Sequence, residues 1–447
     1  MPVRMLSFSC KLDLQGPTVS VAAALLTCGA MSSAMAGPAG GVVVGGQGTI
    51  THPDAHTTLI DQFSNHLEIN WSSFNVGAHE SVRFDQPSSS AVALNRIFDQ
   101  DPSQIFGRID ANGHVILVNP NGILFGQSAQ LNVGSLVASA LDVIGFDAAT
   151  GRYTFGASGT DIGAVINEGR ITAAPGGSVT LLGGRVTNTG HIVADFGTVN
   201  LAAGRTATLD LFGDGLLRLE VDSELLANAS GSASAVENGG TIEARGGQVL
   251  LTAEAVEGIF ANLVNNTGVV RANRIDNSGG TIRLVGEGGI VRSSGVLDAS
   301  AGDSISTGGT VHVLGDYVGL FDGAVVDVSG ATGGGQALIG GGFQGADPEV
   351  PNARRTYVGS EVQIRADAGQ TGTGGEVIVW SDEITRFNGS IVARGGLSGG
   401  DGGFAEVSGK ETLVFRGSVD LSATAGEGGR LLLDPRNITI ATGGTGD

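Results

Sequence analysis

Residues 167–201 read NEGRITAAPGGSVTLLGGRVTNTGHIVADFGTVNL, and this stretch nearly repeats itself. Asn188 follows Asn167 by 21 residues, and Val199 follows Val179 by 20. Within each copy, apolar and polar residues alternate over short runs, which is the period of a β-strand. Glycine and asparagine separate the runs, and both residues tolerate the backbone conformations of sharp corners. The stretch therefore predicts short strands joined by tight corners, one set in every 20 or so residues.

The same pattern of corners and strands continues through the rest of the chain, with longer spacers between its parts. An Asn/Gly corner followed by a Gly-x-Val/Leu-type run recurs at residues 238–251, 295–313, 389–407 and 417–433. Such a coil cannot bury its apolar residues alone, so neighbouring coils must stack and share one core. We predict an all-β chain, a right-handed parallel β-helix. The alternative is a sandwich of short strands, which would not repeat these motifs in register.

Composition narrows the class of protein further. Of 447 residues, 76 are glycine, 15% are charged, and the formal net charge is -20. Disordered chains combine low hydrophobicity with high charge, whereas this chain is 41% hydrophobic. Collagen is excluded because glycine does not recur at every third position. The negative charge, without a basic stripe, argues against nucleic acid as a partner, and no apolar run beyond the N-terminus reaches the length of a membrane span.

Residues 1–36 are predicted to be a signal peptide. Basic residues precede an apolar stretch, and Ala34 and Ala36 form the small-x-small pattern of a cleavage site before Gly37. Cys10 and Cys28, the two cysteines of the chain, both lie in this segment. We therefore expect a cysteine-free exported protein. An uncleaved membrane anchor and a lipoprotein are the weaker alternatives.

The remainder is predicted to hold two regions. Residues 37–160 do not follow the sequence pattern of the repeats. They are expected to cap the N-terminal end of the β-helix, because an open end would expose apolar residues and strand edges. Residues 161–447 are expected to form the repeats, with surface loops near 333–355 and 395–403, where glycine-rich runs break the pattern. No transmembrane segment is expected in the mature chain.

The N-terminal region contains the most specific motif, Asn119-Pro120-Asn121-Gly122-Ile123. Asn121-Gly122 predicts a tight turn between two strands, and Pro120 fixes φ on the way into it. The motif is interpreted first as a stabilising turn, because asparagine side chains can bond backbone groups that a corner leaves unpaired. Direct contact with a partner is the alternative.

With its flanking motifs, this segment resembles the N-terminal secretion domain of the filamentous-haemagglutinin family, which is exported by two-partner secretion. The second Asn-Pro-Asn-Leu motif that some members carry is absent. The resemblance implies a secreted adhesin, or its N-terminal portion, located at the cell surface or outside the cell. It implies passage through the periplasm and recognition by POTRA domains of an Omp85-type outer-membrane transporter. A host-cell or bacterial surface receptor or a glycan would be a further partner.

No persuasive catalytic set is found, so no enzyme activity, cofactor or metal is predicted. His52 and His56 lie four residues apart, but Pro53 between them breaks the geometry of a helical metal pair. Because β-helices include polysaccharide-cleaving enzymes, the carboxylates Asp298, Asp327 and Asp420 keep that alternative open. Asp401 in its glycine loop only loosely resembles a calcium loop. A haem-binding or toxin-delivery exoprotein of the same family, with its effector beyond this chain, is the third hypothesis.

Overall fold

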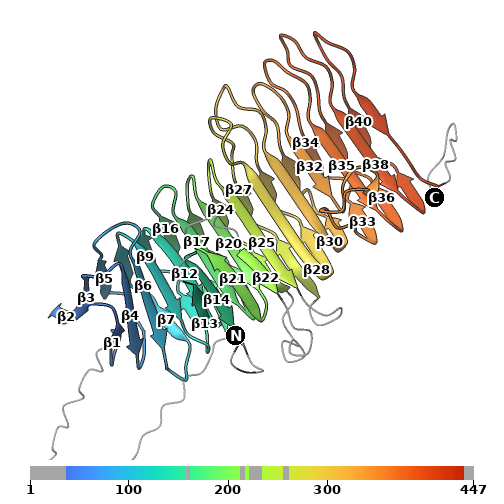
Figure 1. The fold of residues 1–447 in the computed structure, drawn as a ribbon. Coiled ribbons are helices and arrows are strands. Elements are labelled where there is room, and N and C mark those ends of the chain that lie inside the picture. The colour runs from blue at the N-terminus through green and yellow to red at the C-terminus, as the bar shows by residue number, and fades with distance from the viewer. Residues whose placement is uncertain are drawn as a thin grey trace, which may run out of the picture. The chain divides into compact units, whose positions relative to one another are not determined.

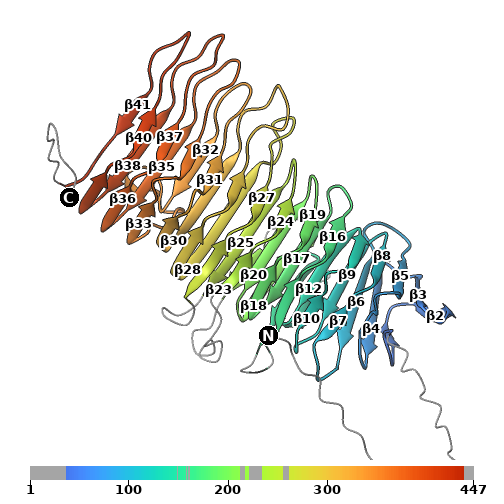
Figure 2. The same ribbon diagram turned by 180° about the vertical axis from the view of Figure 1, so that it is seen from behind.

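The alternating runs form strands that lie on three faces of a parallel β-helix. The structure is a computed structural model, and it describes residues 37–147, 150–157, 159, 162–211, 217–220, 234–254 and 261–436. Each coil passes through face 1, face 2 and face 3 in turn, and the coils stack from the N-terminal to the C-terminal side (Figures 1 and 2). Within each face, a strand pairs in parallel with its counterpart in the next coil. The β-helix that the repeat predicted is confirmed.

The strands of face 1 carry the Gly-x-Val-x-Leu type of sequence. They are β4 (His66–Trp71), β6 (Val92–Ile97), β9 (His114–Val118), β12 (Ser135–Ser139), β17 (Ser178–Gly183), β20 (Thr198–Ala203), β25 (Gln248–Glu254), β28 (Thr281–Ser293), β30 (Thr310–Leu320), β32 (Gln336–Ile339), β35 (Glu376–Ser381), β38 (Phe404–Gly409) and β41 (Arg430–Leu432).

Face 2 joins face 1 through β28 and β30, because each of these long strands continues from one face into the other. The other strands of face 2 are β7 (Ser103–Ile105), β10 (Ile123–Phe125), β15 (Ala164–Asn167), β18 (Arg185–Asn188), β23 (Ser234–Asn238), β26 (Asn262–Asn266), β33 (Arg355–Val358), β36 (Ile384–Phe387) and β39 (Thr412–Phe415).

Face 3 is a separate sheet. They are β3 (Thr57–Gln62), β5 (Ser81–Asp85), β8 (Arg108–Ala111), β11 (Gln130–Val133), β16 (Arg170–Ala173), β19 (His191–Val193), β24 (Thr241–Glu243), β27 (Val269–Arg271), β29 (Val296–Asp298), β31 (Val325–Asp327), β34 (Gln363–Arg365), β37 (Ser390–Val392) and β40 (Ser418–Asp420).

The first strands of the described chain run against this order. β1 (Val42–Gly45) pairs antiparallel with β4, and β2 (Gly48–Asp54) pairs antiparallel with β3. Behind them, Trp71, Phe74 and Phe84 are almost fully buried. The Trp71 indole Nε1 donates a hydrogen bond to Oδ1 of the buried Asn95 at 2.9 Å. The sequence alone did not predict a role for Asn95.

A separate four-stranded antiparallel sheet covers part of the outward side of face 1. It consists of β13 (Asp142–Asp147), β14 (Arg152–Gly156), β21 (Thr206–Asp210) and β22 (Leu217–Glu220). Phe155 and Leu209 belong to the same buried cluster as Leu94 and Leu182 of face 1. Because β14 pairs with β21, this outer sheet joins residues on both sides of position 160.

The two surface loops also have a defined place. β32 lies within the expected loop 333–355, so the excursion from the coil runs between β32 and β33 and includes the short 3-10 helix η2 (Phe343–Gly345). It packs over a second outward cluster on face 1, formed by Leu338, Ile378 and Trp380. The loop near 395–403 connects β37 to β38 without a strand.

Candidate functional site

The motif at residues 119–123 forms the corner between β9 on face 1 and β10 on face 2. Asn119 is fully buried, and its Nδ2 donates to the carbonyl of Asp101 at 3.1 Å and to Ser103 Oγ at 3.0 Å. Its Oδ1 accepts the backbone N–H of Asn121 at 3.0 Å. One side chain thus bonds the preceding coil and its own turn, which explains the need for an amide here.

The second half of the motif closes the turn. The Gly122 N–H donates to the carbonyl of Asn119 at 2.9 Å, and Gly122 adopts a φ of 115°, a conformation that side chains rarely accept. A Cβ at this position would come 2.8 Å from the Ala164 carbonyl oxygen. Asn121 Nδ2 donates to the carbonyl of Asp99 at 2.7 Å, a second link to the preceding coil.

The motif differs in exposure along its length. Ile123 and Gly122 are buried, Pro120 is half-buried, and Asn121 is exposed. Ile123 pairs with Ser103 on one side and with Val165 on the other. Pro120 and Asn121 are therefore the two motif residues that a partner could contact without unfolding of the corner.

The predicted cleavage site falls mostly outside the described residues. Ala34 and Ala36 belong to the part of the chain for which no structure is described, and Gly37 is the first described residue.

The carboxylates considered for catalysis lie on face 3 and carry structural partners. Asp298 and Asp327 are register neighbours on β29 and β31. Asp327 Oδ1 accepts the Ser329 N–H at 2.9 Å, and its Oδ2 lies 4.0 Å from the Arg365 guanidinium. Hydrogen bonds from the Ser422 hydroxyl and from the Ser422 N–H, the latter at 3.0 Å, hold the pKa of Asp420 below its ordinary value.

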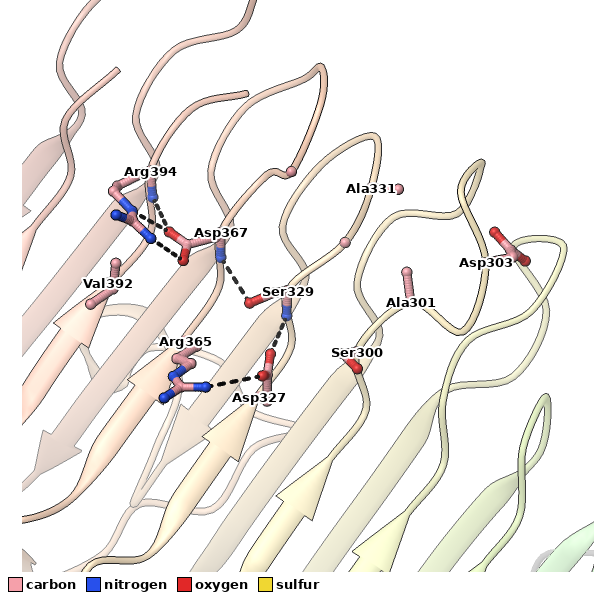
Figure 3. Close-up of a pocket in the computed structure, with 12 residues that line it drawn as sticks. Ser300, Ala301, Asp303, Asp327, Ser329, Ala331, Arg365, Asp367, Val392 and Arg394 are labelled. Atoms are coloured by element: carbon pink, nitrogen blue, oxygen red, sulfur yellow. Dashed lines mark hydrogen bonds and ion pairs between the residues drawn. The ribbon is translucent and has the colours of Figure 1, made fainter. Parts of the chain in front are cut away.

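A groove of about 560 Å³ is lined by Asp327, Ser329 and Arg365 (Figure 3). Asp367 and Arg394 form an ion pair at 3.0 Å on its wall, and Asp303 lines it from a neighbouring corner. Backbone N–H groups of Ile305 and Asp276 donate to Asp303, and the latter bond is the largest of the effects that lower its pKa to about 2. Asp303, Asp327, Asp367 and Asp420 are thus all engaged in hydrogen bonds or ion pairs with the chain itself.

The other candidate ligands lie in two parts of the chain: His52 and His56 in the hairpin of β2 and β3, and Asp401 in the loop between β37 and β38. His52 Nδ1 lies 3.3 Å from Thr58 Oγ1 in the hairpin of β2 and β3, and Asp401 Oδ1 accepts the Glu427 N–H at 2.8 Å. Across the described residues, no cluster of three or more histidine, cysteine, aspartate or glutamate side chains is placed to hold a metal ion. In the same part of the chain, no helix has the length and apolar character needed to cross a membrane.

Comparison with known proteins decides the family. The family described as the TPS secretion domain matches residues 34–299, more than half of the chain. The chain belongs to this family. The match begins next to the predicted cleavage site and continues past residue 160, over the coils that the outer sheet joins.

Similar proteins of known structure or function come from Haemophilus influenzae. The crystal structure of the HMW1 secretion domain has a TM-score of 0.74 and 29% identity, and covers 89% of this chain and all of the HMW1 domain. Two heme/hemopexin-binding proteins are 28% and 32% identical, over 53% and 55% of this chain respectively. The alignment covers 27% of each of these relatives, so the chain matches about a quarter of their length. The chain is thus an exoprotein of the two-partner secretion type.

The outer sheet and Asn95 are the features of this domain that sequence reasoning missed. Val143, Tyr153 and Phe155 are buried, and their alternation with polar residues was a strand signal. Asn95 was the one amide in the apolar run that begins at Ala91. A buried amide in such a position predicts a specific hydrogen-bond partner.

Proposed function

We propose that this chain is a secreted, non-enzymatic adhesin, or the N-terminal portion of one, whose N-terminal domain is recognised in the periplasm by an Omp85-type outer-membrane transporter. The observation that carries the proposal is the likeness to the HMW1 secretion domain over 89% of this chain. The protein would then reach the cell surface and bind a receptor or glycan there. The signal peptide at residues 1–36 would direct its entry into the periplasm.

We assign residues 119–123 a role in export through the fold of the domain. Asn119 bonds Asp101 and Ser103 of the preceding coil, and Asn121 bonds Asp99. Removal of these bonds would separate the two coils at the corner. Pro120 and Asn121 are the accessible residues of the motif, so a transporter that contacts the motif would contact these two.

The first test replaces Asn121 and Gly122 with alanine in cells that carry the cognate transporter. We expect the protein to accumulate in the periplasm and to be lost from the medium, because an alanine in place of Gly122 would have to adopt a φ of 115° beside the Ala164 carbonyl. The measurement is immunoblotting of cell fractions. The matched control is the same pair of substitutions at Asn388 and Gly389, beyond the family match, where an added Cβ would come equally close, 2.8 Å, to the Val362 carbonyl oxygen. Export of the control variant would show that the loss belongs to the 119–123 corner and does not follow from a strained corner in any coil.

The single variant Asn121→Ala separates the two roles of the motif. It removes one exposed hydrogen bond, so a fold-based role predicts near-normal melting and near-normal export. Loss of export with unchanged melting of the purified protein would instead assign the motif to transporter contact. Normal secretion of the double variant would refute the proposed role of residues 121 and 122.

A second candidate function is haem or hemopexin binding, which the two heme/hemopexin-binding relatives favour. The purified secreted protein would be titrated with haem and followed by its Soret absorbance, and passed over immobilised hemopexin. Saturable binding to either would support this candidate. Adhesion to host cells without such binding would support the adhesin.

A further inference from the structure

One corner position recurs in four consecutive coils, three residues before the first inward-facing residue of a face 1 strand. The inward-facing residues are Val179, Val199, Val249 and Ile282, which pair in register. The corner residues are Gly176, Phe196, Gly246 and Gly279, with φ values of 81°, 58°, 69° and 63°. Three of the four coils thus place glycine where φ is positive, and the coil of β20 places phenylalanine there.

Phenylalanine is an unfavourable choice for this backbone conformation. A bulky residue with positive φ is a strained outlier, and such strain persists where the surroundings impose it or where function requires it. The core does not explain it, because the Phe196 side chain points outward and the residue is 56% exposed. Its ring lies over Gly246, where an added Cβ would come 2.5 Å from Phe196 Cδ1.

Neighbouring bonds hold the Phe196 corner in place. The Phe196 N–H donates to the Arg245 carbonyl at 2.7 Å. The preceding residue, Asp195, forms an ion pair with the Arg245 guanidinium and accepts the Arg245 N–H at 3.3 Å. The aromatic ring is therefore presented on a fixed corner.

Phe196 lines a cavity of about 280 Å³ between the four corners and the outward side of face 1. Leu211 lies on another part of its wall, and Ser178, Thr198 and Gln248 add polar side chains. Within the part of the chain that the structure describes, none of these three side chains makes a hydrogen bond to the protein. Hydroxyl and amide groups are thus available beside an exposed aromatic face.

We propose that this cavity binds one pyranose ring of a glycan. A pyranose has an apolar face of C–H groups, which stacks on an aromatic ring, and a rim of hydroxyls, which pair with polar side chains. Phe196 would supply the platform, and Ser178, Thr198 and Gln248 the hydrogen bonds. Pockets for drug-sized ligands begin at about 300 Å³, so the cavity is of a size for a single ring. This inference rests on the proposed adhesive function and names the ligand class for it.

The test is saturation-transfer difference NMR on the secreted protein with three probes at millimolar concentration: the methyl glycosides of β-D-glucose, β-D-galactose and α-D-mannose. We expect saturation of the ring C–H groups of at least one glycoside by the wild-type protein. Phe196→Gly should abolish that signal. It should also leave the melting temperature unchanged or raised, since glycine fits the positive φ. Gln248→Ala should weaken the signal several-fold.

Phe98→Ala is the matched control, because Phe98 is also exposed, at 62%, and lies outside the cavity. It should keep the full signal. Absence of signal with all three glycosides, retention of signal in Phe196→Gly, or loss of thermal stability in that variant would overturn the proposal; the last outcome would assign the ring to packing. Export and cell adhesion are measured separately, so binding of a glycoside without adhesion would refute the adhesin and leave the site standing.

Discussion

A column of asparagines inside the β-helix links successive coils. Asn167 Nδ2 donates to Asn188 Oδ1, Asn188 Nδ2 to Asn238 Oδ1, and Asn238 Nδ2 to Asn266 Oδ1, each at 2.8 Å. Asn266 Nδ2 then donates to Ser293 Oγ at 3.2 Å, where the column ends. All five residues are fully buried. Asn188, Asn238 and Asn266 therefore each accept a hydrogen bond from the preceding coil and donate one to the next, which an amide with both a donor and an acceptor can do. Asn167 Oδ1, at the start of the column, accepts the Gly169 N–H of its own coil.

We expect Asn188→Ala to destabilise the protein. The substitution leaves Asn167 Nδ2 and Asn238 Oδ1 without their partner, and an unsatisfied buried polar group costs about 1–3 kcal/mol. The urea midpoint should fall clearly. Asn132→Ala, which removes an exposed asparagine, is the control, with an expected change within about 0.5 kcal/mol. Equal midpoints for the two variants would show that the column contributes little.

The excursion between β32 and β33 is held by a buried acid on β38. Glu406 is fully buried, and its Oε2 accepts the Gln344 N–H at 3.0 Å. Its Oε1 has no hydrogen-bond partner among the described residues. The Phe343 ring lies edge-on to Phe404, with centroids 5.8 Å apart. Desolvation raises the pKa of Glu406 above its ordinary value, and the bond from Gln344 opposes this in part.

This pKa shift predicts that the excursion opens more readily as pH rises. A raised pKa in the folded state means that the fold favours the neutral carboxyl. Its stabilising contribution is complete below the ordinary pKa of glutamate and is lost as pH rises through the raised value. Hydrogen exchange of residues 340–353, corrected for intrinsic rates, should show falling protection from acidic to neutral pH. Glu406→Gln should remove this dependence, and a profile identical to wild type would contradict the assignment.

For the molecule as a whole, local patterns sufficed to predict the coils, whereas long-range packing could not be predicted. The spacing of 20 residues aligns Val179 with Val199, and they are register partners. The outer sheet depends on the pairing of β14 with β21 across intervening coils, and no repeat in the sequence signals it. β32 was hidden because glycines on both sides of Gln336–Ile339 are typical of a loop.

The candidate site was predictable in its chemistry and not in its partners. Asn121-Gly122 indicated a tight turn, and the positive φ of Gly122 agrees. Asn119 contacts Asp101 and Ser103 because one coil stacks on the next. The spacing between motifs in the sequence does not predict which residues of two stacked coils meet. The sequence alone does not mark Phe196 as unusual. Its position is recognised only when the structure aligns it with the glycines at the same corner of the neighbouring coils.

The stacking of equivalent residues has an evolutionary consequence. Because the inward residue of one face 1 strand lies directly over that of the next, as Val249 lies between Val199 and Ile282, a duplicated or deleted coil leaves every other pairing intact. Excursions such as the one between β32 and β33 leave the coil at a corner and return without shifting the register of β32 on β35. Gene rearrangements that add or remove whole coils could therefore change the length of such a protein without changing its fold. New surface features can arise at the corners in the same way.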